Sequence, residues 1–370
     1  MTRPAFGAST SRGRGLRPHR EAVTSLVKTS ADKLLRPTWV EISLLKLRRN
    51  FERVRKLASK GSPRKVMAVV KADAYGHGAL PVARTLAECA VDWFGVATVE
   101  EALELRAAGI EQPVLLLGGL YMSDPAQLLE YRLTPSVSST ARLDTYAECA
   151  RRSGQTIEFH LKVDTGMGRL GLPPERLASF VEHYRQLKGL QLKGFFTHLA
   201  SAEDLVASQT DDQSERFIAA LSELSSFKIN QPPEQPEFEP ILTFKSRVVY
   251  LKDVPSGTPL GYGGAFHTRR RSRIATVPVG YADGLSRALS GRGRAIIRDR
   301  SARIVGNISM DLTLLDVTDI PGVDVGDEVI LLGRSDHCSI TALEIAHELG
   351  TVPYEILCSI GKRVPRIYVD

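Results

Sequence analysis

Short apolar runs alternate with helix-patterned segments between residues 66 and 197 of this 370-residue chain. A regular strand–helix alternation predicts a parallel sheet, because each parallel connection needs a crossover, usually a helix. At this number of units a closed (β/α) barrel is the leading architecture. The predicted strands are Val66–Val70, Trp93–Ala97, Val114–Leu117, Leu133–Val137, Ile157–Val163 and Leu192–Thr197, with helices such as Val99–Ala108 and Arg176–Leu187 between them.

The pattern changes near residue 228. A proline-rich, acidic stretch over residues 229–240 predicts a linker, and strands dominate beyond it. We therefore expect a tail (1–36), a barrel domain (37–228), the linker, and a mainly β domain (241–370). The barrel domain is expected to begin with a short strand at Trp39–Ile42 and a helix. The predicted β-domain elements are the strands Leu242–Leu251, Arg273–Pro278, Ala295–Ile297, Ala302–Val305, Leu312–Val317 and Glu328–Leu332, and the helix Ala342–Leu349.

The net charge of +7 is concentrated in the tail, where eight Lys and Arg residues face only Glu21 and Asp32. The tail shows no sustained hydrophobic period, which predicts disorder. Its composition is also typical of an organellar transit peptide, and an upstream start codon is a further interpretation. The basic excess is not organised on one face, so we expect no nucleic-acid partner. No apolar run approaches the roughly 18 residues of a membrane helix, so we expect no membrane partner.

Four cysteines are widely scattered and form no CxxC pair. This usage predicts reduced thiols in a cytoplasmic protein. His337, Cys338, His347 and Cys358 lie in one region, but their spacing fits no common zinc-ligand pattern. We therefore expect no metal site.

The apolar run Val66–Val70 ends in Lys71, and a polar, glycine-bearing turn follows at once. A buried parallel strand presents a reactive group at its carboxyl end in this way. A lysine there can form a Schiff base with an aldehyde cofactor when an apolar setting or a nearby cation favours the uncharged amine. Tyr75 could hold a phosphate, and Gly76 and Gly78 let the backbone approach a ligand closely. The alternative is a strand-end lysine that simply reaches solvent.

Residues 69–78, which read VVKADAYGHG, resemble the pyridoxal-phosphate lysine motif of bacterial alanine racemases. Similar blocks run from Pro37 to the last residues of the chain. The resemblance implies a TIM-type (β/α) barrel followed by a C-terminal mainly β domain. It also implies pyridoxal 5'-phosphate as cofactor, a small amino-acid substrate, and a homodimer whose active sites are shared between chains.

Two further blocks of the predicted barrel resemble the family. In the run KVDTGMGRLG, the resemblance implies that Arg169 hydrogen-bonds the cofactor's phenolic oxygen and helps to hold substrate. Lys162 matches a lysine that is often carbamylated and positions that arginine. In FTHLA, His198 matches the histidine that stacks against the pyridine ring. The alternatives are a charged surface turn and a structural histidine.

Four runs in the C-terminal half of the chain resemble signatures of the same family: LGYGG, VGYADG, VGNISMD and PYE. The resemblance implies that Tyr262 is the second catalytic base and reaches into the partner's site. A tyrosine can act as a base only when cationic neighbours lower its pKa toward neutrality. Tyr281 is expected to line the path of the substrate, and Met310 to meet the substrate through its backbone. Tyr354 is expected to bind cofactor phosphate from the partner chain. Each could instead be a turn or strand residue packed for structure.

A long family segment between the histidine block and the β-domain has no counterpart here. In relatives it supplies the last two barrel strands, a phosphate-binding turn and an arginine that contacts the pyridine nitrogen. We expect about six barrel strands, two exposed edges and an open interior. Arg247 cannot replace that arginine, because it falls inside a predicted β-domain strand. A truncated or misassembled sequence, a decayed relative, and an enzyme that rebuilds its wall by dimerisation remain open.

The function implied by the resemblance is interconversion of L- and D-alanine, which supplies D-alanine for peptidoglycan. Lys71 and Tyr262 are expected to serve opposite faces of the substrate as two bases. A racemase of another small amino acid such as serine is an alternative. A degenerate PLP-binding or scaffold protein without turnover is another, because the phosphate-binding segment is missing.

Overall fold

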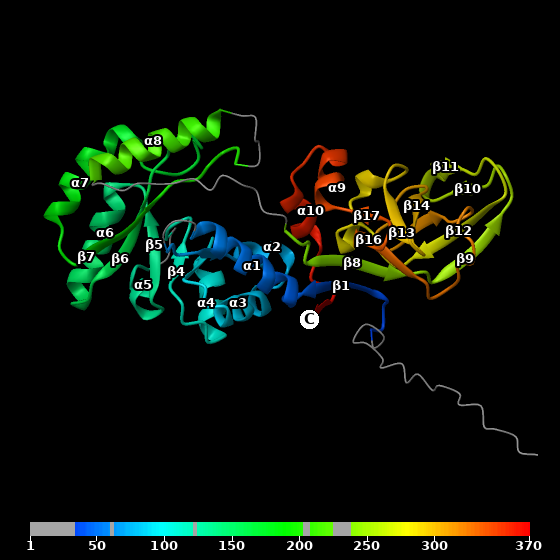
Figure 1. Cartoon of the computed structure of the whole chain (residues 1–370), viewed down its shortest axis with the longest axis horizontal. Helices are drawn as coiled ribbons and strands as arrows, with labels where there is room; N and C mark the ends of the chain where they lie inside the picture. The colour runs from blue at the N-terminus through cyan, green and yellow to red at the C-terminus, as the bar shows by residue number, and fades with distance from the viewer. Residues whose placement is uncertain (1–33, 60–62, 121–123, 203–207, 225–237) are drawn as a thin grey trace, which may run out of the picture.

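The computed structural model describes residues 34–59, 63–120, 124–202, 208–224 and 238–370. These residues form two parts that lie side by side along the long axis of the molecule (Figure 1). One part is a six-stranded sheet with its helices, and the other is a larger sheet with two helices at the junction.

The six-stranded sheet is parallel throughout, and its strands pair in the order in which they occur along the chain. Within the described residues the first and last strands of this sheet do not pair with each other, so the described sheet does not close into a barrel. This confirms the prediction of an incomplete barrel of six strands. Its strands are β2 (Met67–Val69), β3 (Trp93–Val96), β4 (Val114–Leu116), β5 (Leu133–Val137), β6 (Ile157–Lys162) and β7 (Leu190–Phe196).

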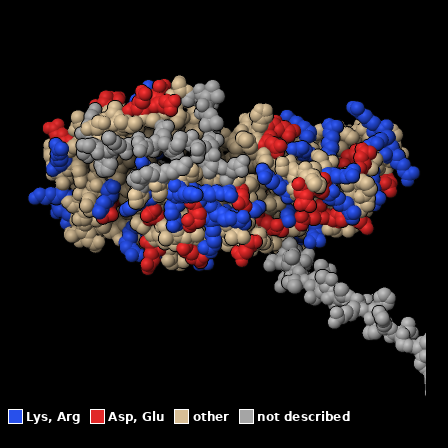
Figure 2. Space-filling view, viewed as in Figure 1, with Lys and Arg blue, Asp and Glu red and all other residues tan. Residues whose placement is uncertain are grey.

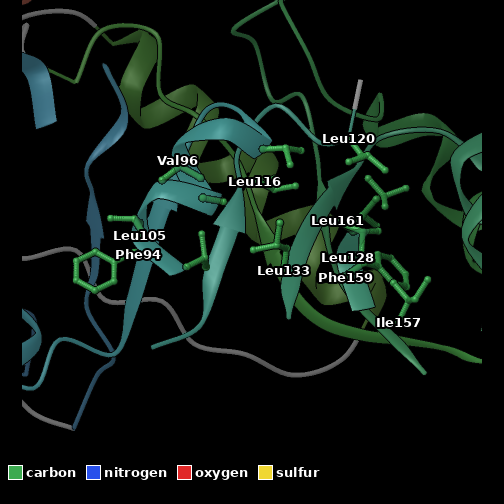
Figure 3. Close-up of a cluster of buried hydrophobic side chains, with 14 of the residues drawn as sticks. Phe94, Val96, Leu105, Leu116, Leu120, Leu128, Leu133, Ile157, Phe159 and Leu161 are labelled. Carbon is green, nitrogen blue, oxygen red and sulfur yellow. The ribbon is translucent and has the colours of Figure 1, made fainter. Parts of the chain in front are cut away.

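Helices cover one face of this sheet and bury its apolar side chains (Figure 3). Along β6, Ile157, Phe159 and Leu161 alternate into this core, as the period of two in a strand requires. The helices of this part are α1 (Leu44–Ala58), α3 (Ala79–Glu88), α4 (Val99–Ala107), α5 (Ala126–Glu130), α6 (Thr140–Ser153), α7 (Leu177–Gln186) and α8 (Gln209–Leu224), with a short segment labelled α2 (Lys71–Gly76) after β2.

The opposite face of the sheet is the interior of the incomplete barrel. His160 of β6 lies there between the rings of Trp93 and Phe196, with ring centroids 4.9 and 6.4 Å away. Val69 at the β2 edge is 38% exposed, although a closed barrel would bury such a side chain in its interior layers. The missing closure therefore exposes apolar surface along the edge that begins at β2.

The second part is a ten-stranded sheet of mostly antiparallel strands in the order β18-β1-β8-β16-β13-β14-β15-β12-β9, with β17 paired to β16. Its core is separate from that of the first sheet. Its strands are β1 (Thr38–Ser43), β8 (Leu242–Arg247), β9 (Tyr250–Val254), β12 (Ser272–Val277), β13 (Arg294–Ile297), β14 (Arg300–Ile304), β15 (Thr313–Asp316), β16 (Glu328–Arg334), β17 (Ser339–Ile340) and β18 (Arg366–Val369). A small hairpin of β10 (Pro259–Leu260) and β11 (Phe266–His267) and the helices α9 (Ala342–Leu349) and α10 (Pro353–Ser359) complete it.

Two boundaries differ from the sequence-based expectation. The first strand after residue 37, β1, pairs with β8 and β18 of the ten-stranded sheet, so it does not belong to the barrel as we expected. The single strand expected over Leu242–Leu251 is two strands, because β8 pairs with β1 and β16 while β9 pairs with β12. Val248 and Val249 carry the chain between these neighbours.

Most of the predicted tail and linker lies outside the described residues, but the ends that are described are anchored. Arg36 forms two hydrogen bonds with the buried carboxylate of Asp283. At the end of the linker, Glu239 exchanges two hydrogen bonds with the Asn50 side chain of α1. None of the described helices is long and apolar enough to cross a membrane. On the face drawn in Figure 2, Lys and Arg are interspersed with Asp and Glu.

Candidate functional site

Lys71 begins a left-handed turn directly after β2. The next four residues, Ala72 to Tyr75, have φ between 51° and 55° and ψ between 43° and 50°. Left-handed conformations cost L-residues about 1–2 kcal/mol each, so a run of four non-glycine residues must be held by its surroundings. Strain of this kind is concentrated at functional sites, and here it fixes the backbone that carries the strand-end lysine.

Several contacts hold this turn. The Glu101 carboxylate accepts a hydrogen bond from the Ala72 amide at 2.7 Å, while the Asp73 side chain accepts one from the Ala79 amide at 2.7 Å. Gly76 closes the turn against α10, where a Cβ would meet the Leu357 carbonyl oxygen at 2.5 Å. We did not single out Glu101 from the sequence. Its signal was the capping box with Thr98 at the start of α4, which the structure contains.

Lys162 and Arg169 lie at the end of β6 and in the loop that follows. Lys162 is only 7% exposed, and its Nζ lies 5.5 Å from the centroid of the Phe196 ring. Burial lowers the pKa of Lys162, and the charges of Arg169 and Lys71 lower it further, against the opposing effect of Asp164. The charges of Lys71 and Arg169 therefore act on the buried amine of Lys162.

Asp164 shapes the loop that presents Arg169. Its Oδ1 accepts hydrogen bonds from the amides of Gly166 and Gly168, both at 3.0 Å. Burial acts to raise the pKa of Asp164, but these backbone donors outweigh it and hold the pKa below its ordinary value. The carboxylate therefore stays ionised and fixes the turn, while the Arg169 side chain is exposed to solvent.

Tyr75 lies beside Lys71, and Tyr354 packs against Tyr75. The Tyr75 ring centroid lies 5.9 Å from Lys71 Nζ and 5.4 Å from the centroid of the Tyr354 ring in α10. The structure places Tyr354 of the same chain beside Tyr75, whereas we expected this tyrosine to act from a partner chain. Burial, followed by the influence of Tyr354 and Cys358, raises the pKa of Tyr75. Its hydroxyl is therefore protonated at neutral pH and is a hydrogen-bond donor.

His198 lies two residues past β7, and its carbonyl oxygen accepts a hydrogen bond from Gln213 Nε2 at 3.1 Å. Gln213 is buried in α8 and also bonds the Thr165 hydroxyl and the Ala200 amide. It thereby ties the ends of β6 and β7 to α8. The sequence carried no local signal for Gln213, because a single glutamine in a helix predicts no particular contact.

The remaining predicted site residues gather in the β-domain. The Tyr262 carbonyl accepts a hydrogen bond from Asn307 Nδ2 at 3.0 Å, in the run that leads to Met310. The Tyr281 and Ala282 amides bond the carbonyls of Ser309 and Met310, both at 3.1 Å. Tyr262 is 74% exposed, and Tyr281 and Met310 are also exposed.

The predicted site residues therefore form two groups within one chain. Lys71, Lys162, Arg169, Tyr75 and Tyr354 lie at the rim of the six-stranded sheet and the adjoining α10. Tyr262 follows β10, and the β10–β11 hairpin lies at the far end of the ten-stranded sheet (Figure 1). Among the residues that the structure describes, no cluster of His, Cys, Asp or Glu could hold a metal ion, and all four cysteines are free.

Known proteins resemble this chain in sequence and in structure. An alanine racemase from Halothermothrix orenii is 39% identical over 372 positions, covering 91% of this chain and 98% of the relative. An alanine racemase structure from Clostridium difficile 630 superposes with a TM-score of 0.81 at 32% identity, covering 91% of this chain and 97% of that one. A structure from Bartonella henselae, described as an alanine racemase with covalently bound pyridoxal phosphate, gives 0.81 at 28% identity, covering 90% and 99%.

The alignments are longer than the part of this chain that they cover. The alignment with the Halothermothrix orenii protein takes in only 91% of the 370 residues here, which leaves about 35 of its 372 positions without a counterpart in this chain. That size agrees with one to two strand–helix units of a barrel. Residues 42–233 match the family described as "Alanine racemase, N-terminal domain", and residues 241–368 match "Alanine racemase, C-terminal domain". Because these matches cover most of the chain in their usual order, the chain belongs to the alanine racemase family of isomerases.

Proposed function

We propose that this chain interconverts L- and D-alanine with pyridoxal 5'-phosphate, using Lys71 and Tyr262 as two bases. The observation that carries the proposal is the strand-end Lys71, fixed on a strained turn beside Lys162 and Arg169. The proposed role is to supply D-alanine for peptidoglycan, from the cytoplasm.

The residues around Lys71 fit this cofactor, which is an anionic aldehyde. The amine of Lys71 can form a Schiff base with the aldehyde carbon of the cofactor. The positive charges of Lys162 and Arg169 attract the negative charges of the cofactor. The Tyr75 and Tyr354 hydroxyls are suitable donors to a phosphate. When bound, pyridoxal phosphate supplies an electron sink that lowers the barrier to loss of the α-proton.

The chain's own residues then move the proton. In the L-to-D direction, one base takes the α-proton from one face of the substrate, and the other base returns a proton from the opposite face, which inverts the centre. We assign these bases to Lys71 Nζ and the Tyr262 hydroxyl. Reversal of the two roles gives the D-to-L direction.

The other predicted site residues hold the reactants. Arg169 offers a guanidinium to the cofactor's phenolic oxygen and to the substrate, and buried Lys162 supports it. In this proposal His198 would contact the cofactor ring. Met310 meets the substrate through its backbone, and Tyr281 lines its path.

The active form is proposed to be a homodimer with shared sites. Tyr262 lies at the far end of its own chain from Lys71, yet it is 74% exposed on a turn fixed by Asn307. An exposed base that cannot serve its own chain is well placed to serve a second copy. A two-fold axis would then complete both sites with the same pair of surfaces.

A mixing experiment tests this proposal. Lys71→Ala and Tyr262→Phe are each expected to lower the racemisation rate by about a thousandfold or more in both directions. When the two inactive variants are unfolded, mixed equally and refolded together, half of the dimers carry one intact site. About a quarter of wild-type activity should therefore return. Full activity in either single variant, or no recovery in the mixture beside a refolded wild-type control, would contradict the proposal.

The open sheet favours a second candidate, a pyridoxal-phosphate-binding relative without turnover. The described part of the six-stranded sheet ends at β7, which is its sixth strand. Phosphate sites of eight-stranded barrels usually follow the seventh and eighth strands, which have no counterpart among the described residues. Titration of the purified protein with pyridoxal phosphate, followed by assays with both alanine enantiomers, separates the two. Binding without α-proton exchange in deuterated water favours this second candidate over the enzyme.

A further inference from the structure

A fully buried carboxylate joins distant segments behind the exposed Tyr281. Asp283 accepts hydrogen bonds from Arg36 Nη1 at 3.0 Å and Nη2 at 2.6 Å, and from the Gly280 amide at 3.0 Å. Arg363 Nε approaches the same carboxylate at 2.8 Å. A buried charge persists only when it is paired and hydrogen-bonded, and here two guanidinium groups and an amide meet that requirement.

Arg363 spans two turns at once. Its guanidinium also bonds the carboxylate of Asp311, the residue after Met310. The two turns are packed directly together, since a Cβ on Gly280 would lie 2.3 Å from the carbonyl oxygens of both Ser309 and Met310. The Tyr281 turn and the Met310 turn are thus clamped to each other by one side chain.

Three residues further along, Arg366 points to the other half of the molecule. Its Nε donates to the Gly76 carbonyl at 3.2 Å, and Gly76 ends the turn that begins at Lys71. The same guanidinium donates to the carbonyls of Ile360, Gly361 and Val364, which fixes the loop that contains Arg363. A single loop, residues 360–366, therefore contacts both the Lys71 turn and the turns of Tyr281 and Met310.

We infer that loop 360–366 is a positioning bridge, in which Arg366 sets the Lys71 turn and Arg363 sets the Tyr281 and Met310 turns. Its kinetic consequences rest on the proposed function. Tyr281 and Met310 are assigned to substrate binding, so a loss at Arg363 raises KM. Lys71 is assigned to proton transfer, so a loss at Arg366 lowers kcat.

The test compares variants of the full-length protein. Arg363→Ala is expected to raise KM for alanine about fivefold or more and to change kcat less than about twofold. Asp311→Ala removes the acceptor of the same link at an exposed position and should reproduce the direction of the effect if Arg363→Ala fails to fold. Arg366→Lys keeps the charge but cannot donate to four carbonyls, and it should lower kcat about tenfold with KM within about twofold. Arg294→Ala, which removes an exposed ion pair with Glu344 in the same domain, is the matched control.

Hydrogen exchange gives a readout that needs no activity. In Arg363→Ala the amides of Tyr281 and Ala282 should exchange at least about tenfold faster than in Arg294→Ala. In Arg366→Lys the faster amides should be those of Ala74 and Gly78, which close the Lys71 turn. Unchanged exchange at these amides, or equal changes of KM and kcat in both arginine variants, overturns the bridge. A wild-type protein without racemase activity overturns the proposed function alone, because the exchange pattern still decides the bridge.

Discussion

The two sheets of this protein differ in how completely their strands are paired and covered. In the ten-stranded sheet, side chains from β1 near the start and from strands beyond residue 241 share one core. The six-stranded sheet has a comparable core under its helices, but its other face opens at β2 and β7. Core burial is therefore similar in the two parts, and the difference between them lies in the uncovered face and unpaired edges of the six-stranded sheet.

The two parts also differ in where strained or charged groups are buried. On the open sheet, buried Lys162 lies near two other cations, and Lys71 begins a strained turn. In the ten-stranded sheet, the buried carboxylate of Asp283 is matched by arginines. The protein thus concentrates its destabilising features where the reaction is proposed, and compensated charges where it needs a rigid frame.

The largest expected effect tests whether the two cores are independent. Phe94 is fully buried in the six-stranded part (Figure 3), so Phe94→Ala should cost about 3–5 kcal/mol there. Calorimetry should show one transition moving to lower temperature while a second, from the ten-stranded sheet, remains in place. Ile297→Ala, at a fully buried position of β13, is the mirror-image control and should move the other transition. A single transition that both variants shift equally would show that the two cores unfold together.

Lys162→Met should make the protein more stable but less active. Methionine fills a similar volume without a buried charge, so the free energy of unfolding should rise. Racemisation should fall by about tenfold or more, because Arg169 loses its neighbour. Denaturant unfolding and rates in both directions check this, and a variant that is both less stable and fully active would refute it.

The same lysine predicts a dependence of stability on pH. The folded state lowers the pKa of Lys162 below its ordinary value of 10.5, so the unfolded chain binds more protons between the two pKa values. Stability from this residue therefore increases with pH across that window and reaches its full value above pH 10.5. The difference between wild type and Lys162→Met should shrink as the pH rises through this window, as measured by urea unfolding at several pH values. A difference that grows instead would show that folding raises the pKa of Lys162 and favours its charged form, which contradicts this account of the residue.

The smallest expected effect concerns the strained turn. Ala72 is exposed and has φ 52°, a conformation that glycine adopts without a steric penalty. Ala72→Gly should stabilise the fold by about 0.5–1 kcal/mol, which is the balance of relieved strain and added freedom in the unfolded chain. Ala108→Gly, where φ is −80°, is the control and should destabilise. Thermal unfolding of both variants decides whether strain is stored in the turn.

Much of the fold was predictable because its signals are local. The alternation of apolar runs located all six strands of the open sheet, and the abrupt turn after Val70 marked Lys71. The sheet to which β1 belongs was not predictable, since a short alternating strand does not specify its neighbours. The left-handed turn was also hidden, because Ala72, Asp73 and Ala74 lack the glycine that usually signals it. Arg363 and Arg366 act on partners far away in the sequence, so no local pattern revealed them.

We propose that the site around Lys71 binds its cofactor although the described sheet does not close. The most direct test is the absorption spectrum of the purified protein with added pyridoxal phosphate, before and after borohydride, with peptide mapping of the product. The account predicts a visible band that borohydride abolishes, and a covalent pyridoxyl group on Lys71 that Lys71→Ala lacks. A spectrum equal to that of free cofactor, with no label on Lys71, would contradict it.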